Sequence, residues 1–400
     1  MKTTIGTHCT VTSSKRFRLS ERAESGVPFF CSKQIIQLEN GEIPSDYDHI
    51  TNEHFRDIQI KYGVPSAGDL LITTRGTYGI PYIYKERDCF YFADGNLTWL
   101  KDFDDCLSSH YLYYWFKSYE GQKKIDAIAK GTAQKAVPIA LIKDLQLSLP
   151  PISQQKRIAS ILSAYDDLIE NNRRQIKLLE EAAQRLYREW FVELRFPGHE
   201  SVKVVDGVPE GWMKGTVDNI VKLLSGYPFK SSEYVSSGKY RLITIKNVKD
   251  GEFSPDNVDY IDQLPDKVPS HCILTEGDIL LSLTGNIGRV CIVNGYNYLL
   301  NQRVAKLQTL HPAYAYCMFR SKEMLNKMTA LSNGVAQQNL SPIRAEKIRI
   351  LIPSSNLLFQ FKNIVEPIIS QIILLNNQIT FACEARDRLL PELMDGEMEV

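Results

Sequence analysis

The sequence predicts an α+β protein made of two copies of one unit, each a globular module followed by a long helix. Three observations lead to this prediction. The chain of 400 residues is longer than one hydrophobic core usually organises. Its second half repeats motifs of its first half, and each copy ends in a helical stretch with a coiled-coil pattern. We therefore expect two pseudo-repeated globular domains separated by two long helices that form an antiparallel coiled coil.

The repeat is clearest at glycine, alanine, glutamine and proline positions. Four of them recur 203 residues later, in the pairs Gly131 and Gly334, Ala133 and Ala336, Gln134 and Gln337, Pro150 and Pro353. Upstream, the segment 68–71 (Gly-Asp-Leu-Leu) returns 209 residues later as 277–280 (Gly-Asp-Ile-Leu), and the glycine pair 76/79 returns as 285/288. The repeat places the first module at 1–150 and its helix at 151–196. It places the second module at 207–353 and its helix at 354–396.

The modules combine strand and helix patterns. Short runs rich in β-forming residues, such as 69–73 and 82–84, are separated by Gly and Asp turns. A helical stretch follows at about 110–130, and its aromatic residues have helix-like spacing, which predicts that they belong to the core. These aromatics are Tyr111, Tyr114, Trp115 and Tyr119. The mixture is typical of an α+β module.

Pro150-Pro151 ends the first module, and the first long helix is predicted to begin after it and to run to about Val192, before Pro197-Gly198. Its apolar positions alternate in steps of four and three, which is the 3.5-residue period of a coiled coil. The predicted seam positions are Ile158, Leu162, Tyr165, Ile169, Asn172, Ile176 and Leu186. The second helix repeats the seam at Phe361, Val365, Ile368, Ile372, Leu375, Ile379 and Leu389. About 40 residues give a helix of roughly 60 Å, and a pseudo-twofold relation between the two units would make the pair antiparallel.

Asn172 is a polar residue on this seam, at the position where the second helix has Leu375. A lone polar seam residue commonly fixes register at some cost in stability. The other interpretation is a solvated side chain at a point where the seam turns outward. The sequence leaves both open.

The composition is that of an ordinary globular protein. Lys+Arg and Asp+Glu are equal at 47 each, which argues against binding of a polyanion by bulk charge. The apolar fraction is 44% and the mean hydropathy is -0.23, and no run approaches 18 consecutive apolar residues. The first residues do not resemble a signal peptide, so we expect a cytoplasmic protein with no membrane partner. The eight cysteines lack zinc-site spacing and are expected to be buried thiols.

The sequence motifs give no sign of catalytic apparatus. The segment 226–231 (Gly-Tyr-Pro-Phe-Lys-Ser) lacks the glycine that precedes the lysine in a phosphate-binding loop. The glycine pairs 76/79 and 285/288 lack the third glycine of a dinucleotide site and fit tight turns better. The histidines show no metal-ligand spacing. We expect no active site, no metal and no cofactor in this chain.

Several segments resemble the specificity subunit of Type I restriction-modification systems, and the resemblance covers essentially the whole chain. It is carried by 149–156 (Leu-Pro-Pro-Ile-Ser-Gln-Gln-Lys), by 191–198 (Phe-Val-Glu-Leu-Arg-Phe-Pro-Gly) and by 389–397 (Leu-Leu-Pro-Glu-Leu-Met-Asp-Gly-Glu). The order and repetition of these segments, with a Gly-x-Ala-Gln element at the end of each module, make the similarity specific.

The resemblance implies a non-catalytic reader of double-stranded DNA. Each of two target recognition domains would bind one half of a split, asymmetric sequence, and the helices would set the gap and dock two methyltransferase subunits. Those subunits would carry S-adenosylmethionine and methylate adenine, and endonuclease/translocase subunits would join them. The expected helix length is compatible with this role, because a rigid helix of roughly 60 Å can span half-sites that lie about one turn of DNA, or about 34 Å, apart.

Candidate DNA contacts are cationic and amide side chains in turns between strands, because such groups bind phosphates and base edges. In the first module the candidates are Lys33, Arg75, Thr77, Tyr78, Thr132, Gln134 and Lys135. In the second they are Lys246, Asn247, Thr284, Asn286, Arg289, Gln302, Arg303, Gln337 and Gln338.

Two modules that read different bases should differ where they read. The repeated glycines therefore fit shared turns better than base contacts, and Gln134 and Gln337 are as well explained by backbone contact as by bracing of the fold. Positions that differ between copies are the candidates for sequence choice. On this basis we pair Arg75 with Leu283 and Tyr78 with Ile287 and expect these positions to carry sequence choice.

Two other functions are compatible with parts of the sequence. A protein-binding scaffold with a coiled-coil spacer suits the neutral net charge, and it predicts no salt-dependent affinity for duplex DNA. A stand-alone nuclease or methyltransferase is disfavoured because the chain has no phosphate loop and no Asn-Pro-Pro-aromatic motif. Methylation by the purified chain alone would support that enzyme.

Overall fold

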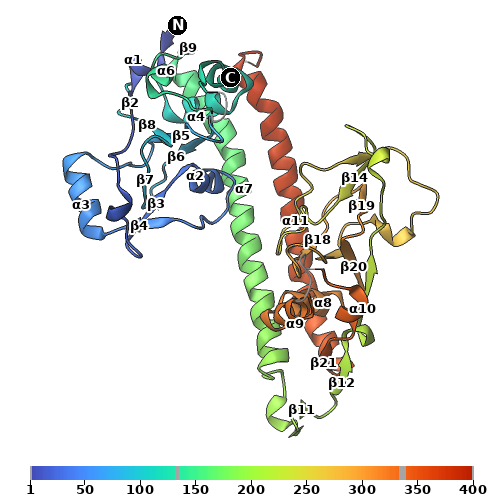
Figure 1. The fold of residues 1–400 in the computed structure, drawn as a ribbon. Coiled ribbons are helices and arrows are strands. Elements are labelled where there is room, and N and C mark those ends of the chain that lie inside the picture. Colours follow the sequence, from blue (N-terminus) through green and yellow to red (C-terminus); the bar gives the residue numbers. More distant parts are fainter. Residues whose placement is uncertain (1, 132–134, 333–338, 399–400) are drawn as a thin grey trace. The chain divides into compact units, whose positions relative to one another are not determined.

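The computed structural model describes residues 2–131, 135–332 and 339–398. They form two compact units. The first comprises Met1–Glu170 together with Ala382–Val400, and the second comprises Asn171–Phe381. Both long helices, α7 (Ile152–Tyr187) and α11 (Ser355–Met394), contribute residues to both units (Figure 1). The units are described separately below.

The first module holds two main sheets in the described residues, a four-stranded sheet in the order β2-β8-β5-β6 and a three-stranded sheet in the order β4-β3-β7. The strands are β1 (Lys2–Thr4), β2 (Thr10–Thr12), β3 (Val27–Phe30), β4 (Asp48–Ile50), β5 (Leu70–Thr73), β6 (Pro81–Ile83), β7 (Tyr91–Phe92), β8 (Leu97–Lys101) and β9 (Gln146–Ser148). All four residues of β5 are buried, which explains why its sequence is a continuous apolar run instead of an alternating one.

The second module repeats this topology. Its four-stranded sheets have the orders β13-β20-β17-β18 and β15-β14-β19-β16 in the described chain. The strands are β10 (Val204–Val205), β11 (Val208–Pro209), β12 (Met213–Thr216), β13 (Val221–Ser225), β14 (Tyr240–Ile243), β15 (Tyr260–Ile261), β16 (Ile273–Leu274), β17 (Ile279–Ser282), β18 (Val290–Ile292), β19 (Tyr298–Leu300), β20 (Val304–Thr309) and β21 (Arg349–Ile352). The parallel pair β14 and β19 corresponds to the parallel pair β3 and β7.

Each module contains a pair of consecutive short helices, whereas the sequence predicted a single helical stretch at about 110–130 in the first module. In the first, α4 (Ser109–Lys117) stops at Ser118, whose Oγ accepts a hydrogen bond from Gly121 N at 3.2 Å and so caps α5 (Tyr119–Ile128). This break turns Tyr119 outward. Its side chain is 80% exposed, so the expectation that it belongs to the core was wrong. The other three aromatics are buried.

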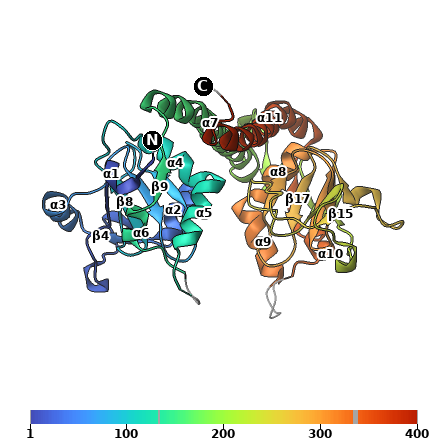
Figure 2. The same cartoon turned by 90° about the horizontal axis from the view of Figure 1, so that it is seen from above.

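The equivalent helices of the second module are α8 (Pro312–Arg320) and α9 (Lys322–Ser332). Within each unit the first helix of the pair packs between the four-stranded sheet and the long helices (Figure 2). The remaining helices are α1 (Ile5–His8), α2 (Ser32–Glu39), α3 (Asn52–Lys61), α6 (Ile139–Lys143) and α10 (Pro342–Glu346). Short η turns are η1 (Leu19–Glu21), η3 (His199–Ser201), η4 (Val217–Asn219), η5 (Ser231–Glu233) and η6 (Ser270–Cys272).

The long helices are antiparallel within each unit. In the first unit Leu393 joins the core cluster of Ile158 and Leu162, and Arg386 pairs with Asp166 further along α7. In the second unit Phe361 packs on Trp190. There α7 passes into a single π-helical turn, η2 (Arg188–Val192), close to the predicted end of the helix.

The seam residues face the helix pair or the adjoining module. Ile158, Leu162, Ile169, Asn172, Phe361, Val365, Ile372 and Leu375 are buried. Tyr165, Ile176, Leu186, Ile368, Ile379 and Leu389 are half-buried. Asn172 is 2% exposed, so the solvated interpretation of this residue was wrong.

One helix of the described chain, α11, is long and apolar enough to cross a membrane when judged by length and composition alone. Its most apolar 18-residue window has a mean hydropathy of 1.3. No segment of this kind is predicted from the sequence, because no run approaches 18 consecutive apolar residues. A helix whose apolar residues pack along a seam passes the same test, and α11 buries Phe361, Val365 and Ile372 in this way.

The cysteines differ from the expectation of uniformly buried thiols. Cys9, Cys272, Cys291 and Cys317 are buried, and Cys31 and Cys383 are half-buried. Cys89 and Cys106 are exposed. Both exposed residues lie outside the named strands and helices, in connecting segments that the apolar periodicity does not describe.

Candidate nucleic-acid interface

The repeated glycine pair shapes the same loop in both modules. In the first glycine loop (residues 74–80, between β5 and β6), Gly76 and Gly79 have φ of 74° and 81°. Gly79 N donates to Thr73 O at 2.7 Å, and Ile80 N donates to Thr73 Oγ1 at 3.0 Å. Positive φ favours glycine, so these residues are required by the turn itself.

The second glycine loop (residues 283–289, between β17 and β18) has the same geometry. Gly285 and Gly288 have φ of 73° and 82°. Gly288 N donates to Ser282 O at 3.1 Å, and Arg289 N donates to Ser282 Oγ at 3.1 Å. A hydroxyl residue at the end of the strand therefore closes the loop in each copy, and the loops give the two modules a common frame for different side chains.

Each glycine loop lies against the segment that follows the short helices. In the first module Val137 N donates to Thr74 O at 2.8 Å, and Arg75 forms a β-bridge with Ala136. In the second module Leu340 N donates to Leu283 O at 2.8 Å, and Thr284 forms a bridge with Asn339.

This register corrects the sequence pairing of Arg75 with Leu283. The equivalent of Leu283 is Thr74, and the equivalent of Arg75 is Thr284. The glycine offset of 209 residues gives the same result. Tyr78 and Ile287 remain paired.

The first glycine loop gathers several of the predicted residues. Arg75 and Thr77 are exposed, and Lys135 is exposed next to the bridge that holds Arg75. Tyr78 is half-buried and packs on the module core. Lys33, at the start of α2, lines a surface pocket together with Thr77. Its Nζ is 2.8 Å from Asp46 Oδ2, and this hydrogen bond lowers the pKa of the Asp46 carboxyl. The charge of Lys33 is therefore partly compensated.

The second glycine loop gathers a comparable set. Asn286 is exposed, and with its amide oxygen turned toward Arg289 it accepts from both terminal guanidinium nitrogens, at 3.2 and 3.0 Å. Arg303 and Gln302 are exposed, and Arg303 O accepts from Leu283 N at 3.0 Å. Lys246 is exposed on a neighbouring turn. These side chains present guanidinium, ammonium and amide groups, the groups that bind phosphates and base edges.

Two predicted contacts are wrong because the side chains are buried and already hydrogen-bonded. Asn247 is 3% exposed. Its Oδ1 accepts from Thr244 N and Oγ1 at 2.9 and 3.0 Å, and its Nδ2 donates to Ser254 O and Asp256 O at 2.9 and 3.2 Å. Thr284 is 6% exposed and donates to Asn339 Oδ1 at 3.0 Å. Both residues brace turns, as polar residues in turns often do.

Four predicted contacts, Thr132, Gln134, Gln337 and Gln338, lie outside the described residues. The structure adds two positions that sequence reasoning missed. Asn96 O accepts from Thr74 N at 2.8 Å and from Ser32 Oγ at 3.0 Å, which makes Asn96 the counterpart of Arg303. Lys130 is exposed and bridges to Ala136 beside Arg75. Comparing the residues before strands 97–101 and 304–309 would have identified Asn96.

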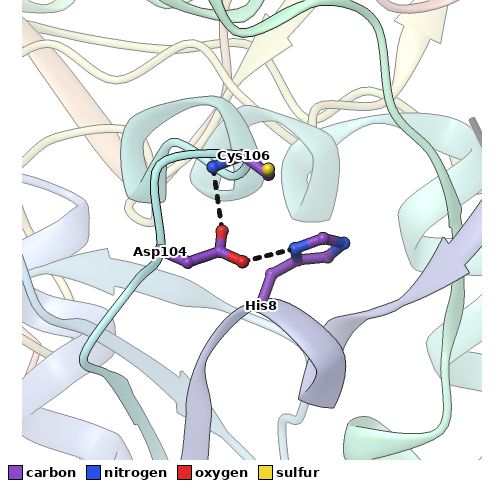
Figure 3. Close-up of side chains that lie close together, drawn as sticks. All are labelled: His8, Asp104 and Cys106. Carbon is purple, nitrogen blue, oxygen red and sulfur yellow. Dashed lines mark hydrogen bonds and ion pairs between the residues drawn. The ribbon is translucent and has the colours of Figure 1, made fainter.

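A second cluster lies away from the glycine loop, where His8, Asp104 and Cys106 come together (Figure 3). His8 is 5% exposed. One ring nitrogen lies 2.8 Å from Asp104 Oδ2 and the other lies 2.9 Å from Thr3 Oγ1. Asp104 Oδ1 accepts from Cys106 N at 2.9 Å.

This cluster has the residue types of a metal site, but both ring nitrogens of His8 and both carboxylate oxygens of Asp104 are already hydrogen-bonded. A metal ion bound to either ring nitrogen of His8 would have to displace the hydrogen-bond partner at that nitrogen. Burial tends to raise the pKa of Asp104, but the hydrogen bonds from His8 and from the Cys106 backbone outweigh it and lower the pKa. The geometry is that of a brace between the N-terminal segment and the loop after β8.

Comparison with known proteins gives a consistent result. A family model described as the Type I restriction modification DNA specificity domain matches residues 3–181 and 209–380. The chain is similar to the Type I restriction enzyme MjaIX specificity subunit of Methanocaldococcus jannaschii, with 25% identity over 97% of this chain and 90% of that protein. The MjaVIII specificity subunit of the same organism is 27% identical over 64% of this chain and 61% of that protein.

A solved structure supports the fold. The crystal structure of the Type I restriction-modification system S subunit from M. genitalium matches with a TM-score of 0.60 and 16% identity. The match covers 98% of this chain and 95% of that one.

Proposed function

The chain belongs to the Type I restriction-modification DNA specificity domain family, and from that premise we propose that it is the sequence-reading subunit of a Type I restriction-modification complex. Each module would read one half of a bipartite, asymmetric site in double-stranded DNA. The observation that carries this proposal is the duplicated glycine loop, which has the same backbone in both modules but different exposed side chains.

The side chains of the two loops favour reading of different bases. The first loop offers Arg75 and Thr77, whereas the second offers Asn286 and Arg289. Arginine commonly pairs with guanine and asparagine with adenine in the major groove, and lysines around them would contact phosphates. Two modules that bind different half-sites require this combination of a shared loop backbone and different exposed side chains.

The long helices would set the distance between half-sites and dock two methyltransferase subunits. Those subunits would bind S-adenosylmethionine and methylate adenine. This chain would select the DNA sequence and would not catalyse a reaction. Endonuclease/translocase subunits would complete a complex that cuts unmethylated DNA. The complex would act in the cytoplasm, where chromosomal and incoming DNA are accessible. The family membership and the similarity to a specificity subunit over 97% of the chain support this assignment.

The decisive experiment maps methylation. The chain is produced with its candidate methyltransferase partner in a host that lacks such a system, and methylated adenines are located across the genome. A split motif with a fixed gap is the expected result. Absence of methylation, together with absence of salt-dependent binding to duplex DNA, would favour the protein-binding scaffold that the neutral net charge also allows.

A further inference from the structure

A tyrosine and a basic residue one helical turn apart recur in the two modules. Tyr113 and Lys117 lie on α4, and Tyr316 and Arg320 lie 203 residues later on α8. Residues at this spacing share one face of a helix. In both modules the pair closes on a glutamate, but the glutamates come from different parts of the fold.

The first clasp consists of Glu39, Tyr113 and Lys117. Tyr113 Oη donates to Glu39 Oε1 at 2.5 Å, and Lys117 Nζ donates to the same oxygen at 2.8 Å. Lys117 Nζ also lies 3.0 Å from Tyr113 Oη. Glu39 is the last residue of α2, the helix that begins next to Lys33 and shares a surface pocket with Thr77 of the glycine loop. The first clasp therefore fixes α2 within its own module.

The second clasp consists of Glu180, Tyr316 and Arg320. Tyr316 Oη and Arg320 Nη1 both donate to the Glu180 carboxylate, and Arg320 Nη1 lies 2.8 Å from Tyr316 Oη. The Glu180 and Arg320 side chains are only 10% and 11% exposed. Glu180 lies on α7, so the second clasp attaches the module to the long helix.

The second clasp also reaches the candidate reading surface. Arg320 lines one pocket with Asn286 and Arg289 of the second glycine loop, and its Nε donates to Asp250 Oδ1 at 3.1 Å. Burial lowers the pKa of Arg320 to about 10, which leaves the guanidinium charged at neutral pH. Leaving the buried Arg320 guanidinium without a carboxylate partner would therefore destabilise the fold.

The first module is attached to α7 by different residues. Tyr114 Oη donates to Asp166 Oδ2 at 2.7 Å, and Arg386 Nη1 donates to Asp166 Oδ1 at 2.6 Å. Lys85 and Arg87 pair with Glu170 nearby, with side chains 43% and 55% exposed. These contacts attach the first module to α7, so the first clasp does not take part in that attachment.

We propose that the two clasps position different parts of the reading apparatus. The first holds α2 and so sets base preference in one half-site, whereas the second holds the angle of its module on α7 and so sets tolerance to the length of the gap. The inference rests on the proposed function. Both glutamates act as positioning residues, since neither is placed at the reading surface.

The test compares Glu39→Gln with Glu180→Gln, which are the same chemical change at equivalent clasps. Glu181→Gln serves as a control, because Glu181 is the exposed neighbour of Glu180 on α7. Each full-length chain is assembled with its methyltransferase partner and given duplexes with the native gap, with gaps one or two base pairs longer or shorter, and with single substitutions in each half-site. Methylation rates are measured on every duplex.

Glu180→Gln should reduce the preference for the native gap over its neighbours by about tenfold, because the buried Arg320 guanidinium loses the charge of one of its two carboxylate partners and keeps only Asp250. It should leave base preference in the first half-site unchanged. Glu39→Gln should do the reverse, and Glu181→Gln should behave like the unaltered chain. If Glu180→Gln does not fold, Tyr316→Phe removes the two hydrogen bonds that the Tyr316 hydroxyl makes with Glu180 and Arg320, leaves the Glu180–Arg320 ion pair in place, and should shift gap preference in the same direction.

Two outcomes would overturn the inference. In one, Glu180→Gln lowers the rate by a common factor on all gaps, as loss of stability alone would do. In the other, both variants change gap preference equally. Failure of the proposed function is distinguishable, because the unaltered complex would then methylate no split site and the inference would fall with it.

Discussion

Asn172 and Gln378 join the two long helices within the second unit, where Asn172 Nδ2 donates to Gln378 Oε1 at 3.1 Å. Asn172 is buried, while Gln378 is exposed. Asn172 therefore lies in the apolar seam, and its hydrogen-bond partner lies at the solvent-exposed edge. A single polar residue in a seam fixes the register of the helices, because only one register gives it a partner.

Replacing Asn172 with Leu should stabilise the chain by about 1 kcal/mol, because a buried amide gives way to an apolar seam residue and Gln378 can still bond to water. Thermal unfolding measures the effect, with Asn171→Leu as an exposed control that should change little. A loss of stability larger than that of the control would contradict this account of Asn172.

Replacing Arg75 with Ala should weaken or relax recognition of one half-site by about 1–3 kcal/mol and leave the other half-site intact. The physical reason is that Arg75 is exposed on the first glycine loop, whereas its equivalent on the second glycine loop is the buried Thr284. Methylation rates on duplexes substituted in either half-site provide the measurement. Arg303→Ala makes the same chemical change at an exposed arginine of the second module, although not at the structural equivalent of Arg75, and should affect the opposite half-site. Equal losses at both half-sites from Arg75→Ala would contradict the assignment.

Gly288 should tolerate alanine less well than Gly285. Both have positive φ, which costs an alanine about 1–2 kcal/mol. A Cβ on Gly288 would also lie 2.6 Å from Leu325 Cδ1, whereas the nearest side-chain atom to a Cβ on Gly285 is Ile245 Cδ1 at 3.5 Å. Chemical denaturation of the two variants compares their stabilities. Equal losses would show that the Leu325 side chain moves aside freely.

The contribution of Asp104 to stability should depend on pH. Its folded pKa lies below the ordinary value of 3.8, so the stabilisation is fully present above that value and is lost as the pH falls through the folded pKa. Asp104→Asn should cost about 1 kcal/mol at neutral pH, a modest value because the carboxylate is partly exposed. The difference from the unaltered chain should vanish once the pH lies below the folded pKa of Asp104.

Unfolding measured across this pH range checks the prediction. Asp105→Asn is a suitable control, because Asp105 is the exposed neighbour. A difference between the Asp104 variant and the unaltered chain that stays constant down to the lowest pH would show that the carboxylate charge is not the source of the effect.

Much of the architecture was predictable because it follows from residue types and their spacing over short stretches of sequence. The seam positions follow from a period of 3.5 residues, and the glycine loops follow from residues that tolerate positive φ. The break between α4 and α5 was missed because Ser118 acts as both a stop and a cap, and the aromatic spacing continues across it. The pairing of Arg75 with Leu283 failed because a shift of one residue in a loop is invisible until a β-bridge fixes the register.

The sequence by itself determined that the chain is a repeat, where its two long helices lie, which of their residues face a seam, and which family it resembles. Each of these depends on spacing along the chain. Only the tertiary structure decided that Asn247 and Thr284 brace turns, that His8 meets Asp104 across 96 residues, and that Tyr316 meets Glu180 across 136. Such contacts depend on which side chains the packed elements bring within hydrogen-bond distance, and residue type and spacing along the chain do not specify that.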